Sequence, residues 1–318
     1  MDFSELGPLG RDLLSKKLLF VTGKGGVGKS TVAGALGRIT SKLGAKTLIC
    51  EVDAKGDIGR LFGVDDVAFA PTQVAPNLFL MAMNTEDALA EYLRLNLRIP
   101  LITTLGPLAK AFDFVANAAP GVKEILVVGK LCYEVRERNY DVVIVDASAS
   151  GHIVSQLSSP EGISELFQFG LVKEQTRWMS EILSNHSDTS VVVVSTPEET
   201  PVNESLELIA RLKNETSLGI SAAIINRVME EPFTGNDRAI YEEVVAEVAS
   251  GESEIPSEVV ETSQLALGLR EVRAIESRRL VNNLPDGVAS IFVPYFFDIF
   301  EPSALSIEVA DSLLGEFS

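Results

Sequence analysis

The stretch that decides the fold is "VTGKGGVGKST", which occupies residues 21–31. It contains the pattern Gly23-x-x-x-x-Gly28-Lys29-Ser30 and follows a short apolar run, "KKLLFVT" (16–22). The residues after it place apolar side chains at helical spacing, namely Val32, Ala35, Leu36, Ile39 and Leu43. A strand, a glycine-rich turn and a helix in this order predict a loop that holds phosphate at the start of the helix.

Each residue type in this loop has a chemical role. The glycines let successive backbone N–H groups turn toward one anion, and Lys29 adds a mobile positive charge for the β- and γ-phosphates. The Ser30 hydroxyl can bind Mg²⁺, and Thr31 can bond the α-phosphate. The alternative is a glycine turn that binds nothing. The residues predicted to hold the nucleotide are Gly23, Lys24, Gly25, Gly26, Val27, Gly28, Lys29, Ser30 and Thr31.

The rest of the chain continues an alternating pattern. "AKTLICEVD" (45–53) reads as a second strand, so the first 37 or so residues from the loop strand onward form a βαβ unit with parallel strands. Further apolar strands are predicted at 141–147, 190–196, 220–226 and 289–295, with helical patterns between most of them. Apolar strands covered by helices on both faces predict an α/β fold with a doubly wound, mainly parallel sheet.

Two segments interrupt this alternation. Residues 64 to about 140 separate the second and third predicted strands by far more than one crossover helix, and they read as a helical insertion. Residues 230–288 are acidic and punctuated by Gly, Ser and Pro, with a helix expected in "DRAIYEEVVAEVASG". The phosphate loop occurs once, so we interpret residues 1–318 as one P-loop ATPase domain with two helical elaborations.

Charge and composition exclude several classes of partner. The formal net charge is −18 and the isoelectric point is near 4.6, which disfavours nucleic acid and anionic lipid. The start of the chain does not resemble a secretory signal, and no apolar run is long enough to span a bilayer. Only two cysteines occur, Cys50 and Cys132, which fits a reducing compartment. We therefore expect a cytoplasmic protein without direct membrane insertion.

Carboxylates at strand ends supply the groups that Mg²⁺ and an attacking water require. "VVIVD" ends in Asp146, a position suited to hold Mg²⁺ through its water shell, and "LICEVD" ends in Asp53, which could orient the water. Asp57 and Asp65 are alternatives to Asp53. Glu51 shares a side of the strand with Asp53, but an ordinary structural acid is the simpler interpretation of that residue.

These residues carry a family resemblance. "GKGGVGKST" resembles the deviant Walker A loop of the SIMIBI-class P-loop ATPases, and "DASASGHIVSQLSSP" (146–160) resembles the switch II segment of the ArsA family. "STPEETPVNESLELIARL" (195–212), "IINR" (224–227) and "EVDAKGDIGRLFG" (51–63) are also similar to segments of that family. The resemblance is greatest to bacterial single-unit ArsA-like ATPases, some of which occur as paired paralogues.

The resemblance implies a role for five positions. Lys24 matches the signature lysine that reaches across a dimer interface to the partner's nucleotide. Asp53 matches the switch I aspartate that positions water, and Asp146 matches the switch II aspartate near Mg²⁺. Asn226 matches an asparagine that reads the adenine edge, and Pro294 lies where a family proline lines the base pocket. ATP or ADP with Mg²⁺ are the cofactors implied.

The chain also departs from the family pattern. Ala54 and Gly56 replace a proline and a histidine of switch I, and switch II reads Ala-Ser-Ala-Ser where the family has Thr-Ala-Pro-Thr. These changes bear on loop rigidity and on the rate of hydrolysis. The cysteine triad for arsenite or antimonite is absent, which argues against metalloid efflux.

Two functions remain open. The first is a dimeric Mg-dependent ATPase, as a homodimer or a heterodimer with a paralogous ATPase, that couples to a membrane transporter or a hydrophobic client protein. The second is a nucleotide-gated regulatory or scaffold subunit with little hydrolysis. A client surface could involve Met81, Met83, Phe112 and Phe114, although packing in the core is the alternative for these side chains.

Overall fold

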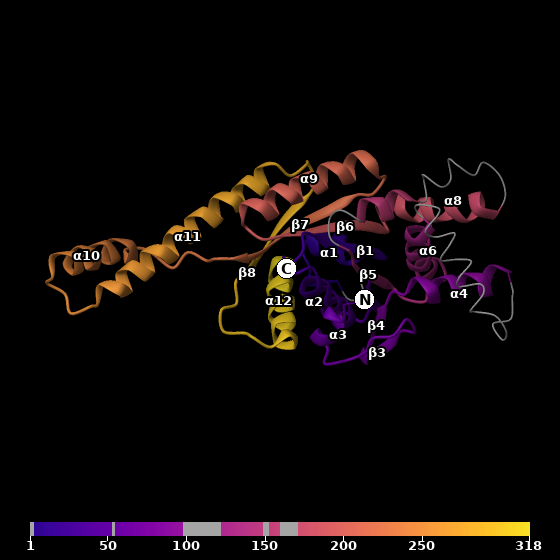
Figure 1. Cartoon of the computed structure of the whole chain (residues 1–318), viewed down its shortest axis with the longest axis horizontal. Coiled ribbons are helices and arrows are strands. Elements are labelled where there is room, and N and C mark those ends of the chain that lie inside the picture. The colour runs from indigo at the N-terminus through magenta and orange to yellow at the C-terminus, as the bar shows by residue number, and fades with distance from the viewer. Residues whose placement is uncertain (1–2, 53–54, 98–121, 149–152, 160–170) are drawn as a thin grey trace.

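A computed structural model of the chain describes residues 3–52, 55–97, 122–148, 153–159 and 171–318. Its centre is an eight-stranded sheet in the order β3-β4-β2-β5-β1-β6-β7-β8 (Figure 1). All neighbouring strands are parallel except β3 and β4, which are antiparallel. The predicted doubly wound, mainly parallel α/β sheet is confirmed.

The strands are short and mostly buried. Six of them match the predicted apolar runs: β1 (Leu18–Gly23), β2 (Thr47–Glu51), β5 (Val142–Asp146), β6 (Thr189–Ser195), β7 (Ile220–Val228) and β8 (Ala289–Pro294). The phosphate loop follows β1, near the middle of the sheet, with β5 on one side and β6 on the other. Ligands of open parallel sheets bind at the carboxyl ends of such central strands.

Helices cover the sheet on both faces. They are α1 (Pro8–Leu14), α2 (Lys29–Lys42), α3 (Asp57–Leu61), α4 (Thr85–Leu97), α6 (Val122–Arg136), α8 (Leu171–Ser184), α9 (Glu199–Glu215), α10 (Asp237–Ser250), α11 (Ser257–Asn282) and α12 (Pro302–Glu316). Residues of α1, α2, α3 and α12 share one apolar cluster with alternate strand residues. Residues of α4, α6, α8 and α9 share a second cluster with the intervening strand residues. This alternation explains why the strands read as continuous apolar runs.

The insertion expected at 64–140 differs from the prediction in its first part. Residues 72–75 and 78–82 form β3 and β4, and β4 extends the sheet by pairing with β2. Pro76 and Asn77 make the turn between them, with Asn77 at a φ of 60°. Helices follow as expected in α4 and α6. Met81 and Met83 are buried in the core, whereas Phe112 and Phe114 lie outside the described residues.

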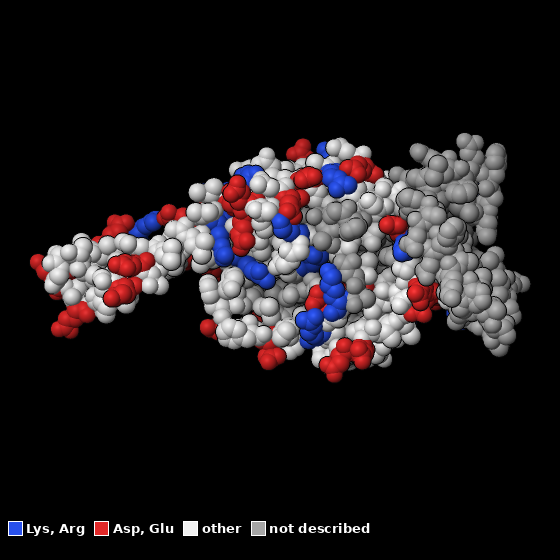
Figure 2. Space-filling model, viewed as in Figure 1, with Lys and Arg blue, Asp and Glu red and all other residues white. Residues whose placement is uncertain are grey.

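The acidic segment at 230–288 contains the two helices α10 and α11, which extend from the body as an arm (Figure 1). No residue of α10 is buried. Acidic side chains are spread over the arm and much of the visible face of the molecule (Figure 2). Lys and Arg side chains gather near the middle of this face. The arm also exposes large apolar side chains, which are Ile240, Val259, Leu265, Leu269, Val272 and Ile275.

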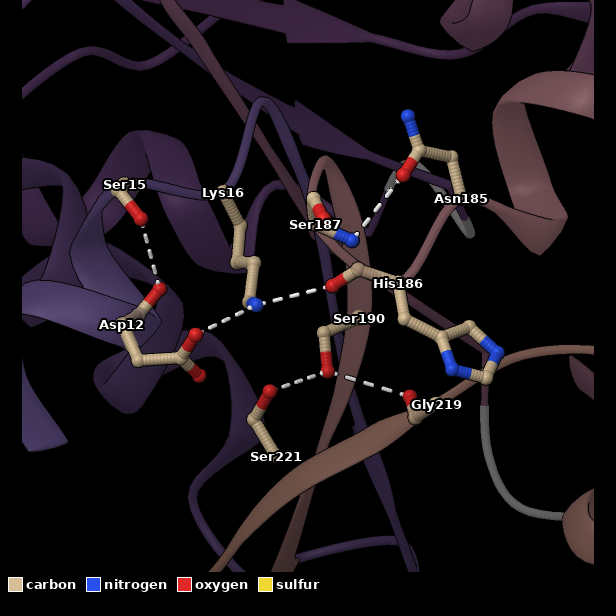
Figure 3. A network of polar contacts seen from close by, with 9 residues as sticks. All are labelled: Asp12, Ser15, Lys16, Asn185, His186, Ser187, Ser190, Gly219 and Ser221. Carbon is tan, nitrogen blue, oxygen red and sulfur yellow. Dashed lines mark hydrogen bonds and ion pairs between the residues drawn. The ribbon is translucent and has the colours of Figure 1, made fainter.

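A polar network fixes the amino end of the sheet, away from the phosphate loop (Figure 3). Lys16 is only 5% exposed, and its ammonium group donates to Asp12 at 2.8 Å and to the backbone carbonyl of His186 at 2.9 Å. These bonds join α1 to the turn before β6. The His186 side chain is exposed.

The described helices include none that is both long and apolar enough to cross a membrane. Cys50 and Cys132 are free and fully buried, and burial raises the pKa of both thiols. Both cysteines are therefore core residues.

Candidate nucleotide site

The phosphate loop has the backbone shape that its glycines predict. Gly23, Gly26 and Gly28 have φ values of 149°, 84° and 97°, a region that residues with a side chain rarely adopt. A Cβ at Gly23 would lie 2.1 Å from the carbonyl oxygen of Val194 on β6. The loop is therefore pressed against the neighbouring strand, and only glycine fits there.

The loop ends at the start of α2. Lys29 is the first residue of this helix, and Gly28 precedes it without any side-chain cap. The first N–H groups of a helix have no intrahelical acceptor, and they carry the positive end of its dipole. The ammonium group of Lys29 lies over the loop, 3.2 Å from the carbonyl oxygen of Lys24. This arrangement can receive a phosphate chain.

Asn226, at the carboxyl end of β7, contacts the loop directly. Its side-chain amide donates to the carbonyl of Val27 at 2.8 Å, and its side-chain oxygen accepts from the N–H of Arg227 at 3.0 Å. Asn226 is 6% exposed, and a Cβ on Gly28 would lie 2.4 Å from its amide nitrogen. The described contacts of Asn226 thus hold the phosphate loop. One amide N–H remains available to a ligand.

Lys24 is paired within its own chain. Its ammonium group contacts the carboxylate of Glu204 on α9, and both side chains are about one-third exposed, at 33% and 36%. The family resemblance implies a role for Lys24 across a dimer interface, whereas in the single chain its side chain contacts Glu204.

Asp146 lies at the end of β5, beside the loop. It is 6% exposed, and it is hydrogen-bonded to Ser30, the second residue of α2. Burial raises the pKa of Asp146 to about 6, an effect that the charges of Glu51 and Asp57 increase and the Ser30 bond and Lys29 oppose. Its Oδ1 is buried without a hydrogen-bond partner. A buried carboxylate in this state is suited to a cation.

Glu51 ends β2 and lies next to Asp146 across the two strands. It is 2% exposed, and its Oε1 accepts from the backbone N–H groups of Lys55 and Asp57, both at 3.0 Å. Its Oε2 is buried without a partner. The simpler interpretation, an ordinary structural acid, accounts for Oε1 but not for Oε2.

Asp53 and Ala54 lie outside the described residues. The chain on either side of them is placed, with Val52 donating its N–H to the carbonyl of Asp146 at 3.1 Å. Gly56 has a φ of 76° and precedes α3, so the glycine found in place of the family histidine suits a left-handed position. Pro294 ends β8 and pairs with Val228 of β7, close in sequence to Asn226.

The residues present fit a magnesium ion. Mg²⁺ is usually held by one or two carboxylates, a hydroxyl and phosphate oxygens, with water completing the shell. Ser30 and Asp146 supply the hydroxyl and a carboxylate with an unpartnered buried oxygen. Among the described residues, no group of three or more His, Cys, Asp and Glu could hold a metal alone. A Mg²⁺ ion here would therefore depend on the nucleotide for further ligands.

A hollow of about 530 Å³ elsewhere on the surface is a separate feature. It is lined by residues near the carboxyl end of α2, by the β3–β4 turn and by α12, including Lys42, Asn77 and Asp311. The phosphate loop lies at the other end of the 14-residue α2, about 20 Å away. The hollow is not part of the nucleotide site.

Comparison with known proteins agrees with this geometry. The family model described as "Anion-transporting ATPase" matches residues 16–170 and 168–254. The chain belongs to the anion-transporting ATPase family. Its membership confirms the resemblance to the ArsA family.

Individual relatives of this family member carry ATPase names. "ATPase BagA" of Mycobacterium tuberculosis is 31% identical over 207 residues, which cover 62% of this chain and 61% of the relative. "ATPase ASNA1 homolog 1" of Paramecium tetraurelia is 27% identical over 159 residues, or 48% of this chain and 47% of the relative. "ATPase ASNA1 homolog" of Cryptosporidium parvum is 28% identical over 212 residues, or 64% and 54%. The chain thus spans about half to three-fifths of these relatives' length.

Sequence reasoning missed two contacts of the phosphate loop, and it favoured a purely structural role for Glu51. Glu204 lies 180 residues from Lys24, and nothing in the sequence pairs these two charges. Glu51 carried a weak signal, because a charged residue at the end of an otherwise apolar strand requires a partner when it is buried. The hydrogen bond from Asn226 to Val27 was also not predicted.

Proposed function

We propose that this protein is a Mg-dependent ATPase that converts ATP and water to ADP and phosphate. The observation that carries the proposal is the junction of the glycine loop, α2 and Asp146. There, the amino end of α2 follows the glycine loop, the Lys29 ammonium group contacts the loop, and the buried carboxylate of Asp146 is bonded to Ser30. Membership of an ATPase family supports the same chemistry.

Different residues of the site would bind the phosphates and the metal. The loop N–H groups and Lys29 hold the phosphates, and Ser30 with Asp146 holds the metal. Bound Mg²⁺ would neutralise phosphate charge as it develops in the transition state. We propose that Asp53 orients the attacking water, which rests on its place after β2 and on the family resemblance.

The adenine base of the nucleotide would lie beyond the carboxyl end of β7. We propose that Asn226 and Pro294 contribute to its pocket, in keeping with their neighbouring positions at the ends of β7 and β8. Asn226 would then serve twice, because one of its amide hydrogens already holds Val27. This double role links base recognition to the shape of the phosphate loop.

We propose further that the working unit is a dimer, either of two copies or with a paralogous ATPase. The support is the extra cation in the loop, since Lys29 suffices for one nucleotide. Lys24 must leave Glu204 before it can reach a partner's nucleotide. Breaking this partly exposed pair costs little, because such pairs contribute about 1 kcal/mol or less.

Hydrolysis in this proposal drives a partner protein, either a membrane transporter or a hydrophobic client. The exposed apolar side chains of α11, including Leu265 and Leu269, support a protein partner. Nucleic acid stays disfavoured by the net charge of −18. The two free, buried cysteines are in keeping with a reducing, cytoplasmic setting.

The proposal is tested by steady-state ATP hydrolysis with and without Mg²⁺. Wild type is compared with Lys29→Ala and Asp146→Asn, and Arg211→Ala on the exposed side of α9 serves as the control. Each site variant is expected to lose about 10²-fold or more in turnover, because it removes a charge that acts on the phosphates or the metal. Wild-type turnover no faster than that of the variants contradicts an active enzyme.

A second function remains in view, a nucleotide-gated regulatory subunit with little hydrolysis. The replacements at Ala54 and Gly56 favour it, since they alter the loop that would position water. This protein would bind ATP with Mg²⁺ tightly and hydrolyse it slowly, alone and with a paralogous ATPase. Binding measured with a fluorescent ATP analogue, set beside turnover, separates the two functions.

A further inference from the structure

Two buried carboxylates stand side by side at the end of the sheet. Glu51 of β2 is the register partner of Asp146 of β5, and Val21 of β1 is the next partner along the same row. Side chains in one such row point to the same face of a parallel sheet. Ile49 and Ile144, two residues earlier, belong to the cluster that contains α2. Glu51 and Asp146 therefore share the face on which the phosphate loop enters its helix.

Neither carboxylate has its full set of partners. Glu51 is 2% exposed with Oε2 unpartnered, and Asp146 is 6% exposed with Oδ1 unpartnered. Two like charges in a dry site repel each other, and each loses the water that would stabilise it. Ser30 and Lys29 act on Asp146 and relieve part of this cost. The orphaned oxygens on both residues require a further positive charge.

The other oxygen of Glu51 has a different task. Oε1 accepts from the N–H groups of Lys55 and Asp57, which flank Gly56 in the loop after β2. Asp57 begins α3, so the same oxygen also fixes the start of that helix. The Glu51 carboxylate thus contacts the loop through Oε1, and its Oε2 has no hydrogen-bond partner.

We propose that Glu51 is a second carboxylate of the divalent-cation site and that it couples this cation to the loop after β2. The inference rests on the proposed function, because a Mg-nucleotide must occupy the site. Glu51 would supply its unpartnered Oε2 to the cation, beside the Ser30 hydroxyl and Asp146. Because Oε1 of the same side chain holds the N–H groups of Lys55 and Asp57, occupancy of the cation site would be felt by this loop.

The test is a Mg²⁺ titration of the full chain with bound ADP, using a fluorescent methylanthraniloyl-ADP as the probe. Glu51→Gln keeps the size and one oxygen acceptor of the side chain but removes its charge. Glu207→Gln, an exposed position on α9, is the matched control. We expect Glu51→Gln to weaken Mg²⁺ binding by about 10- to 100-fold, which is the usual effect of substituting a residue that supports the direct ligands of a metal. Binding of ADP in EDTA should be unchanged.

Thermal unfolding without nucleotide is a second measurement, because the two possible roles of Glu51 predict changes in Tm of opposite sign. Removing a repelling buried charge should raise the Tm of Glu51→Gln above that of wild type, because its amide can donate where the carboxylate could not. A residue that only anchors the loop would instead lower the Tm when substituted. Hydrogen exchange at the Lys55 and Asp57 amides should slow on adding Mg²⁺ and ADP in wild type, and slow less in Glu51→Gln.

The outcomes separate two failures. If wild type binds ADP with Mg²⁺ and Glu51→Gln shows the same Mg²⁺ dependence within about twofold, Glu51 is not part of the cation site and the inference is wrong. If Glu51→Gln lowers the Tm and leaves Mg²⁺ binding intact, Glu51 is a loop anchor alone. If wild type binds no ADP under any Mg²⁺ concentration, the proposed function itself fails.

Discussion

Lys24 and Glu204 form an ion pair within one chain, between the phosphate loop and α9. Lys24 precedes the helix start by five residues, and Glu204 lies on a helix that packs against α11 and the sheet. Lys24 is the residue proposed to act across a dimer interface, and in the single chain its ammonium group is paired with Glu204. In the proposed dimer, this pair would have to open before Lys24 could reach the partner's nucleotide.

This pair gives a prediction about assembly. Glu204→Gln removes the competing carboxylate, so Lys24 is free to reach a partner's nucleotide. We expect a higher fraction of dimer in the presence of ATP and Mg²⁺, by up to about fivefold in the association constant for each Lys24 released, since a partly exposed pair contributes about 1 kcal/mol or less. Light scattering with and without nucleotide measures this association constant.

Glu207→Gln, one turn along α9, is the control for this experiment and should leave the association constant at the wild-type value. The Tm of the Glu204 variant should stay close to that of wild type, because the pair is partly exposed. A dimer fraction that falls in Glu204→Gln would show that Glu204 supports the interface and does not restrain Lys24.

The hydrogen bond between Asn226 and Val27 predicts a link between β7 and phosphate binding. Asn226→Ala should weaken ADP binding by about fivefold, because the loss of one buried hydrogen bond costs about 1 kcal/mol and loosens the loop. Isothermal calorimetry with ADP measures the effect. Asn226→Asp should be worse than Ala, since its carboxylate would face the Val27 carbonyl. Equal affinity in all three proteins contradicts the link.

A buried ion cluster joins α4 to α6, and it predicts a stability effect away from the nucleotide site. Lys130 is 9% exposed and contacts Glu91 at 2.6 Å and Glu134 at 2.5 Å. Lys130→Met should lower the free energy of unfolding by about 3–5 kcal/mol, because it leaves buried carboxylates without a cation. Urea denaturation measures this loss. Arg211→Met, which breaks an exposed pair on α9, should cost less than about 1 kcal/mol.

Asp146 predicts a pH dependence of the nucleotide-free protein. Burial raises its pKa from 3.8 to about 6, so the folded protein holds this proton more tightly than the unfolded chain does. The contribution of Asp146 to stability therefore falls as the pH rises from about 4 to about 6, and it stays low above that range. Unfolding curves of wild type and Asp146→Asn should converge toward pH 4. A constant difference between them over this range would contradict the assignment.

Much of the fold could be predicted from sequence because the central strands are buried on both faces. Residues such as Val143 and Ile144 alternate between two cores, so no polar residue interrupts the run. The exception is β3–β4, which was expected to belong to a helical segment. A five-residue apolar run such as "LFLMA" has no period that separates a strand from a helix. The Pro76–Asn77 turn was the signal that could have decided it.

The contacts of the site that could be predicted from sequence are those between residues close together in the chain. Contacts local to the glycine loop, such as Lys29 at the start of α2, follow from the sequence order of strand, loop and helix. Contacts between elements far apart in the chain, such as Lys24 with Glu204 and Asn226 with Val27, depend on how the sheet is wound. Glu51 required the register of β2 on β5 before its neighbour Asp146 could be seen.

In the proposed dimeric ATPase, each chain places Lys24 at its partner's nucleotide. The most direct measurement mixes Lys24→Ala protein with Asp53→Asn protein and follows ATP hydrolysis. Each homodimer lacks one essential group at both sites, whereas a mixed dimer has one intact site. We expect recovery of up to roughly a quarter of wild-type turnover in an equal mixture, because half of the dimers are mixed and each of these has one intact site out of two. Turnover equal to the sum of the two variants measured alone would contradict it.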